Sequence, residues 1–331
     1  RVPSSSTSTM AAALSRLRLP LIGAPLFIVS NPQLVIAQCK AGIVGSFPAL
    51  NARPQHMLES WILQIKEALA EHDATHERKA APFAVNQIVH RSNNRLQQDL
   101  EVCVKHEVPL VITSLGARED VNAAVHSYGG IVMHDVINSR FARKAIDKGA
   151  DGLVAVAAGA GGHAGTLSPF ALVQEIREWF DGPLALSGSI ASGRAVLAAQ
   201  AAGADFAYAG SVFIASEEAN ATDAYKQALV DSVADDIVYS NLFTGVHGNY
   251  LKASIINAGL DPDNLPQSDP SQMDFGTGSG PDTKKAWRDI WGCGQGIGAV
   301  RSVEPLSRIV DRIEREYEDA AAQLVAKIKR G

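Results

Sequence analysis

The sequence predicts an α/β protein with a (β/α)8 TIM barrel and a smaller, mostly helical domain inserted after the eighth strand. Eight short apolar runs alternate with longer helical patterns, and Gly, Pro, Ser or Asn closes each run, as parallel βα units require. Most runs are apolar at consecutive positions, which is typical of strands buried on both faces. Eight such strands predict a closed barrel. The runs are residues 21–23, 43–45, 83–85, 110–112, 131–133, 153–156, 184–186 and 206–209.

The joints between helices and strands support a repeated unit. The segments 40–43, 148–152 and 202–206 each place a glycine where a helix can end in the left-handed conformation. A last helix, expected to return to the barrel wall, begins near Pro305 and has positive charge in its final turn. Its apolar face, with spacings of three and four, is formed by Leu306, Ile309, Val310, Ile313, Tyr317, Ala320, Ala321, Leu324 and Ile328.

Between the eighth run and this helix, residues 215–298 hold one helical stretch and then a region rich in Pro, Gly and Asp. A loop of this length is rarely structureless inside a compact domain. We therefore expect residues 215–298 to form an inserted domain that contacts substrate or covers it as a lid. Residues 10–214 and 299–331 then form the barrel, and residues 1–9, which lack an apolar segment, form a disordered tail.

Composition excludes several classes of protein. The 331 residues are 46% hydrophobic and 20% charged, as in soluble globular proteins, and no apolar stretch is long enough to span a membrane. A net charge of -5 without a long Lys/Arg run argues against nucleic acid as a partner. Cys39, Cys103 and Cys293 form no CxxC pair, which indicates a reducing, cytoplasmic location. The nine histidines form no recognisable set of metal ligands, so no metal is expected.

A glycine-dense loop at residues 157–165 follows the sixth run and carries His163. In a barrel of this kind the loops after the strands meet at one rim, where active sites lie. Glycine allows a close approach of backbone to a ligand, and histidine is the side chain whose ordinary pKa lies nearest neutrality. His163 is therefore the candidate catalytic residue. The alternative is a surface or packing role.

The loops after the seventh and eighth runs, residues 187–194 and 210–213, predict a phosphate site. They read SGSIASGR and GSVF. Small Gly/Ser turns that lead into helices present N–H and hydroxyl donors, and phosphate sites in barrels often follow strands seven and eight. The alternative is a pair of tight turns that use Gly and Ser only for their geometry.

Motifs at the strand ends form an ordered set along the chain. They are Ala24-Pro25-Leu26, Asn86, Gly161-Gly162-His163-Ala164-Gly165, Ser187-Gly188-Ser189, Gly210-Ser211 and Trp291-Gly292-Cys293-Gly294-Gln295-Gly296. The set resembles the nitronate monooxygenase family, formerly called 2-nitropropane dioxygenases, from Leu19 to the end of the chain. That family also embraces FMN-dependent enoyl-acyl-carrier-protein reductases and NADH:quinone reductases.

The resemblance implies FMN as the cofactor. Asn86 would hydrogen-bond the polar edge of the flavin ring, although an Asn that caps a turn is an equal alternative. His163 would face the substrate, and Gln295 would come near the ring unless it only stabilises its loop. The backbone of Ala24, Pro25 and Leu26 would border the ring, and that of Gly161 and Gly162 would lie along the cofactor. The phosphate would be held by Ser187, Gly188, Ser189, Gly210 and Ser211.

Two positions depart from the family pattern. Met is common where Leu26 stands, and some members have a Lys near the cofactor after the fifth strand, where this chain has His134 and Asp135. A carboxylate near an FMN phosphate would be repulsive, so we expect Asp135 to point away or to serve another role. His134 could contact cofactor or substrate, or could bond a neighbouring carbonyl. Further substrate candidates in the segment 242–252 are Phe243, His247 and Tyr250, which could equally form the core of the inserted domain.

The leading hypothesis for function is FMN-dependent oxidation of a nitronate or nitroalkane by dioxygen, with His163 as base or anion stabiliser. One alternative is an NAD(P)H-dependent FMN reductase of a quinone or enoyl substrate. Another is a flavin-free barrel that binds a phosphorylated metabolite. The expected partners are a small-molecule substrate and dioxygen, and the protein is expected to be a monomer or homodimer.

Overall fold

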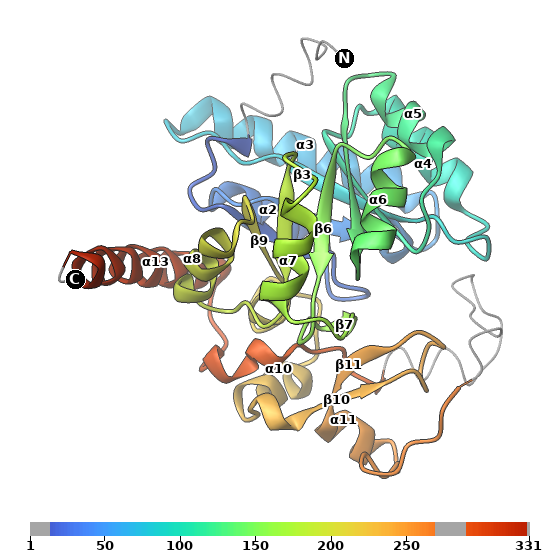
Figure 1. Cartoon of the computed structure of the whole chain (residues 1–331). Coiled ribbons are helices and arrows are strands. Elements are labelled where there is room, and N and C mark those ends of the chain that lie inside the picture. The colour runs from blue at the N-terminus through green and yellow to red at the C-terminus, as the bar shows by residue number, and fades with distance from the viewer. Residues whose placement is uncertain (1–13, 269–288, 330–331) are drawn as a thin grey trace.

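A computed structural model describes residues 14–268 and 289–329 and shows a β/α barrel with helices around its outside (Figure 1). Eight parallel strands run in the order β1-β9-β8-β6-β5-β4-β3-β2. Seven of them contain a predicted run, whereas β2 begins at Gly45, the last residue of the predicted run 43–45. Their bounds are β1 (Leu21–Gly23), β2 (Gly45–Pro48), β3 (Phe83–Ile88), β4 (Leu110–Ser114), β5 (Ile131–Val136), β6 (Gly152–Val156), β8 (Leu184–Ser187) and β9 (Phe206–Ala209).

The sheet closes into a barrel because β1 contacts β9 on one side and the chain just before β2 on the other. On one side β1 pairs with β9 in parallel register, with Leu21 opposite Ala207. On the other side the contact with the chain before β2 is shorter: a single bridge joins Ile22 to Val44, and the Gly23 N–H donates to the Val44 carbonyl at 2.7 Å. Closure confirms the predicted barrel, in which the carboxyl ends of all eight strands lie at one rim.

Several helices around the barrel have an N-cap residue whose side chain can accept a hydrogen bond from the first turn. The side chains of Asn31, Asn138 and Ser192 each accept a hydrogen bond from a backbone N–H of the first turn. No helix in the described part of the chain is long and apolar enough to span a membrane. The helices are α2 (Pro32–Lys40), α3 (Met57–Thr75), α4 (Leu96–Lys105), α5 (Glu119–His126), α6 (Ser139–Asp147), α7 (Pro169–Arg177), α8 (Gly193–Ala202) and α13 (Leu306–Ile328), with a 3-10 turn η1 (Ala49–Asn51) after β2.

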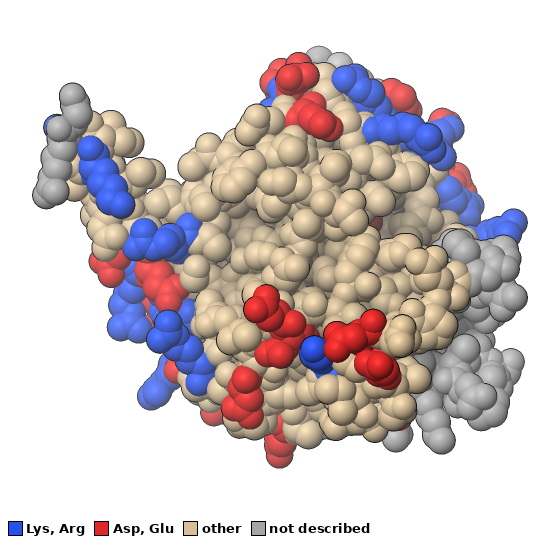
Figure 2. Space-filling view, turned by 60° about the horizontal axis from the view of Figure 1, so that its bottom comes forward, with Lys and Arg blue, Asp and Glu red and all other residues tan. Residues whose placement is uncertain are grey.

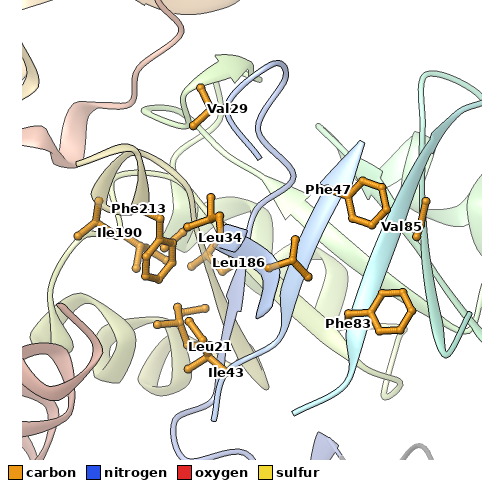
Figure 3. Packing of buried hydrophobic residues seen from close by; sticks show 14 of the residues in the cluster. Leu21, Val29, Leu34, Ile43, Phe47, Phe83, Val85, Leu186, Ile190 and Phe213 are labelled. Atoms are coloured by element: carbon orange, nitrogen blue, oxygen red, sulfur yellow. The ribbon is translucent and has the colours of Figure 1, made fainter. Parts of the chain in front are cut away.

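Side chains of the barrel strands alternate between two cores. Outward-facing residues pack against the helices, and Figure 3 shows part of this layer, including Leu21, Ile43 and Phe47. Inward-facing residues fill the barrel; they include Ile22, Val44, Ala84, Leu110, Ile112, Ile131, Met133, Val154, Ala185 and Tyr208. Because successive residues of a strand point to opposite faces, the same parity directs Asn86, Ser114, Asp135 and Ser187 inward at the rim.

The last helix returns to the barrel wall, as predicted. Leu306, Ile309 and Ile313 are buried against the barrel. The apolar face does not pack over its whole length, however. Leu324 is 41% exposed and Ile328 is 70% exposed, because the end of α13 extends away from the barrel (Figure 1).

Gly193, at the start of α8, lets α13 pack at backbone distance. A Cβ at this position would lie 2.0 Å from the Ile313 carbonyl oxygen and 2.2 Å from the Tyr317 nitrogen. Gly193→Ala should therefore lower the free energy of unfolding by about 1 to 3 kcal/mol, as overpacking does elsewhere. Gly298→Ala is the matched control, because its Cβ would meet nothing within 4 Å. Urea unfolding of both variants would measure the difference, and equal stabilities would contradict this account of the contact.

The inserted segment contains a strand hairpin as well as helices. Its strands β10 and β11 pair antiparallel, and β11 also pairs with β7, which lies within the glycine-dense loop. The hairpin was not predicted. Its elements and those flanking it are β7 (Gly162–His163), α9 (Ser211–Ile214), α10 (Asp223–Val230), η2 (Ala234–Asp236), β10 (Ile237–Ser240), β11 (Gly248–Leu251), α11 (Lys252–Asn257) and η4 (Gln295–Ala299). The predicted tail at 1–9 and residues 269–288 of the predicted domain lie outside the described residues.

Candidate active site

The glycine-dense loop follows β6 at the rim and contacts two other segments there. Two of its glycines have left-handed backbone, with φ of 84° at Gly159 and 64° at Gly162. The Gly159 carbonyl accepts hydrogen bonds from the N–H groups of Ser189 at 3.3 Å and Gln295 at 2.9 Å. A Cβ on Gly159 would lie 2.2 Å from the Ser189 Oγ. Glycine at this position therefore brings together the loop after β6, the loop after β8 and the segment before α13.

His163 lies on β7, opposite Gly248 of β11. Its ring is half-buried, and Nε2 lies 3.0 Å from the Oγ1 of Thr244 in the inserted segment. Burial lowers the pKa of the His163 imidazole to about 4, because the charged form loses its hydration. At neutral pH the ring is therefore neutral and can accept a proton.

The loops after β1 and β9 lie side by side. A Cβ on Gly210 would lie 2.9 Å from the Leu26 Cδ2 and 3.5 Å from the Ala24 Cβ. Pro25 lies between Ala24 and Leu26 in the chain and is half-buried. The Oγ of Ser211 accepts a hydrogen bond from the Gly294 N–H at 2.8 Å. The sequence prediction had placed these residues in one site, and the structure brings them together.

The turn after β8 has an unusual backbone. Gly188 has φ 141°, and Ser189, which is not a glycine, has φ 58°. A Cβ on Gly188 would lie 2.7 Å from the Ala158 carbonyl oxygen. Ser187, the last residue of β8, is buried, whereas Ser189 is exposed. The turn therefore packs on the glycine-dense loop and directs its polar groups toward the rim.

A polar chain crosses the inner face of three neighbouring strands. The Asn86 Nδ2 donates to the Ile112 carbonyl at 3.0 Å and to the Ser114 Oγ at 2.8 Å. The Ser114 Oγ in turn donates to the Asp135 Oδ2 at 2.7 Å. These two hydrogen bonds fix the orientation of the Asn86 amide, with its nitrogen toward Ile112 and Ser114. The sequence analysis missed Ser114, although a hydroxyl at the carboxyl end of the fourth strand was a signal for it.

Burial raises the pKa of the Asp135 carboxyl to about 6, from an ordinary value of 3.8, because the charged form is poorly solvated there. The folded state therefore holds this proton more tightly than the unfolded chain, and the contribution of Asp135 to stability falls as pH rises from about 4 to about 6. Asp135→Asn keeps an oxygen that can accept from Ser114 but cannot ionise. It should stabilise the flavin-free protein by about 1 to 3 kcal/mol more at about pH 8 than at about pH 4. Urea unfolding at both pH values would test this, and a pH-independent difference would contradict it.

His134 is not brought to the rim, so its expected contact with cofactor or substrate is not supported by its position. Its neighbours two residues away, Val132 and Val136, belong to the outer core. The His134 Nδ1 lies 2.6 Å from the Thr113 Oγ1 rather than against a backbone carbonyl. Burial and the charge of Lys144 lower the pKa of His134 to about 4. His134 and Asp135 are successive residues of β5, so their side chains point to opposite faces of the strand, and that of Asp135 faces inward.

Two of the aromatic candidates of the inserted segment pack mainly with each other. The Phe243 and Tyr250 rings meet edge to face at 5.0 Å, in a small core that includes Ile255 and Ile290. The third candidate, His247, is exposed and stacks on Tyr239 at 5.1 Å. Phe243 and Tyr250 therefore have a structural role in this segment, which the sequence analysis had held open.

The rim offers the features that a flavin nucleotide would need. Gly161, Ser189 and Gln295 are exposed although their loops pack closely, and the space beside the Cα of Gly162 is open. Beneath them the amide of Asn86 provides polar groups, and Ser187 and Ser211 provide hydroxyls. Within the described ranges, no group of three His, Cys, Asp or Glu side chains could hold a metal ion.

The barrel and this rim define the class of the protein: it is a β/α-barrel enzyme with its candidate active site at the carboxyl ends of the strands. A sequence model of the family named nitronate monooxygenase matches residues 8–272. The chain therefore belongs to the nitronate monooxygenase family, as its motifs had indicated.

Individual relatives agree with this assignment. A nitronate monooxygenase from Paraburkholderia phytofirmans is 26% identical over an alignment of 344 positions, gaps included, that spans 92% of this chain and 94% of that protein. The solved structure of nitroalkane oxidase from Streptomyces ansochromogenes is similar with a TM-score of 0.77 and 23% identity, over 94% of this chain and 99% of the other. FabK from Thermotoga maritima is similar with a TM-score of 0.73 and 21% identity, over 96% and 98%. At these identities the structural similarities show the fold alone.

Proposed function

We propose that the rim binds FMN. The phosphate would lie at the turns after β8 and β9, where Ser187, Gly188, Ser189, Gly210 and Ser211 converge. The ring would lie across the inner layer, bordered by Ala24, Pro25 and Leu26 and bonded by Asn86. The backbone of Gly161 and Gly162 and the side chain of Gln295 would lie along its accessible side. The open space beside the Cα of Gly162 and the exposure of Gly161 and Ser189 at the same rim support this proposal, because they leave polar backbone and a hydroxyl accessible to a ligand.

The reaction that these residues favour is oxidation of a nitronate or a nitroalkane. When bound, FMN would accept electrons from the substrate and pass them to dioxygen. The work of the protein is to bind the substrate, to exclude water and to move one proton. For a neutral nitroalkane, His163 would remove the proton from the carbon next to the nitro group.

The position of His163 is the observation that carries this proposal. The ring lies on β7 within the glycine-dense loop, and its lowered pKa leaves it unprotonated at neutral pH, so it can take up a proton, whereas an anion stabiliser would need the proton already in place. A bound nitronate would itself favour protonation of the ring by its negative charge. The face that carries the inserted segment is mostly uncharged, with mainly acidic side chains, and basic ones among them, across its lower half (Figure 2). Such a surface suits a small substrate better than a polyanion.

Turnover with different substrates tests this function. The purified protein should consume dioxygen with propionate 3-nitronate and with a simple nitroalkane, and NADH should not be required. Rapid NADH oxidation that depends on a quinone or an enoyl substrate, without activity on nitronates, would instead support the reductase alternative. A colourless protein that takes up no added FMN would contradict both and favour the flavin-free barrel.

A further inference from the structure

We propose that Asp135 takes up one proton when FMN binds, so that a neutral carboxyl lies beneath the flavin ring. This inference rests on the proposed binding of FMN at the rim. It adds the residue through which that binding depends on pH, and it can fail while FMN still binds.

Asp135 lies on the inner face of β5, near the carboxyl end of the strand. Met133, two residues earlier, belongs to the inner core, and residues two apart on a strand point to the same face. Across the sheet Asp135 is paired with Val154 of β6, which also belongs to the inner core. Asp135 is half-buried, so solvent can reach part of the residue. Its carboxyl therefore borders the layer that the flavin ring would cover.

No positive charge offsets the Asp135 carboxylate within the described part of the chain. The Ser114 hydroxyl donates to its Oδ2 at 2.7 Å, and no basic side chain lowers its pKa. Tyr208 of β9 faces it across the barrel interior and stays neutral, because burial and the charge of Asp135 raise the pKa of Tyr208. His134 points to the outer face of β5, and Lys144 lies on α6, outside the barrel. Neutral donors alone thus support the carboxylate.

A flavin ring across this layer would take the remaining solvent away from the carboxyl. Loss of hydration disfavours the charged form, and the phosphate of FMN adds negative charge to the rim. Burial already raises the pKa of Asp135 to about 6, so a further rise on binding would keep the carboxyl protonated at neutral pH. A protonated carboxyl also avoids repulsion of the negative charge that electrons bring to the flavin.

FMN should bind more weakly as pH rises, because the free protein must then gain the proton. Below about pH 6 the carboxyl is protonated before FMN binds, so the affinity should be highest there. Above about pH 6 binding requires uptake of a proton, and the affinity should fall by up to about tenfold for each further pH unit. His134 and His163 have pKa values of about 4 and do not titrate in this range.

Asp135→Asn keeps the shape of the side chain and cannot ionise. It should bind FMN about as tightly as the wild type at about pH 5, and about 10- to 100-fold more tightly at about pH 8. Asp151→Asn is the matched control, because Asp151 is a half-buried carboxylate just before β6, at the opposite end of the barrel. The FMN phosphate also titrates near about pH 6, but it contributes equally to all three proteins and cancels in the comparison.

Ser114→Ala tests the identity of the titrating group in a second way. The Ser114 hydrogen bond favours the charged form of Asp135, so its removal should raise the pKa of this carboxyl in the free protein. The fall in FMN affinity should then begin at a higher pH than in the wild type, whatever the affinity itself. A fall that begins at the same pH would overturn the assignment to Asp135.

Two measurements on the flavin-free protein decide the proposal. Quenching of FMN fluorescence gives the dissociation constant between about pH 5 and about pH 9, and calorimetry in two buffers of different ionisation enthalpy gives the protons taken up. At about pH 7.5 the wild type and Asp151→Asn should take up close to one proton more per FMN than Asp135→Asn. Equal uptake in all three proteins, or parallel pH profiles of affinity, would overturn the proposal. Failure of the wild type to bind FMN at any pH would instead contradict the proposed function, and this inference with it.

Discussion

Replacing His163 by asparagine is expected to lower the turnover of a neutral nitroalkane by about 10²- to 10⁴-fold, the usual contribution of a general base. Asparagine can still bond Thr244 but cannot take up a proton near neutral pH. A nitronate has already lost the proton concerned, so its turnover should change by much less. The ratio of the two activities therefore reports the role of His163 as a base.

His76→Asn is the control for this experiment, because His76 is an exposed histidine at the C-terminal end of α3, on the side of the barrel opposite the rim, and should keep both activities. FMN content should be equal in the wild type and both variants. If His163→Asn reduced nitroalkane and nitronate turnover to the same extent, His163 would not be the base, and a role in holding the substrate anion would replace it.

The second large effect is expected at Ser211, which is buried at the proposed phosphate site. Ser211→Asp would place a carboxylate beside the phosphate. Two like charges at about 4 Å repel by about 4 kcal/mol at an effective dielectric constant of about 20, which is roughly a thousandfold in affinity. The variant should therefore be purified without flavin.

Ser211→Asn separates charge from size in this test, since Asn and Asp have the same shape. The Asn variant should retain most of its FMN, with a loss near that of one neutral hydrogen bond, about 1 kcal/mol. The dissociation constant of FMN would be measured from flavin fluorescence for both proteins. Equal affinities in the Asp and Asn variants would contradict a phosphate at this position.

The barrel could be predicted from the sequence because its signals are local. Each strand is a short apolar run with a turn residue after it, and the last helix has a regular apolar face. Their order then implies closure, and closure brings the predicted loops to one rim. The strand-end positions of Ala24, Asn86, Ser187 and Ser211 follow from this topology, whereas the cofactor contacts proposed for Ala24 and Asn86 come from the family resemblance.

The features that escaped prediction depend on contacts distant in sequence. The pairing of β11 with β7 joins residues that no local pattern connects, so neither the hairpin nor the contact of Thr244 with His163 was visible. His134 was expected at the rim because it lies at the end of its strand, a position that by itself does not show to which face the side chain points. The His134 side chain points to the face opposite those of Met133 and Asp135, so it is directed outward. That distinction can be made only once the two cores of the barrel are known.

The central claim is tested most directly by mixing the FMN-loaded protein with substrate in the absence of oxygen. Propionate 3-nitronate should change the visible flavin spectrum within the time of a single turnover, and NADH alone should leave it unchanged over the same period. Rapid bleaching by NADH, with no response to the nitronate, would contradict the proposed oxidation of nitronates and identify the protein as a reductase.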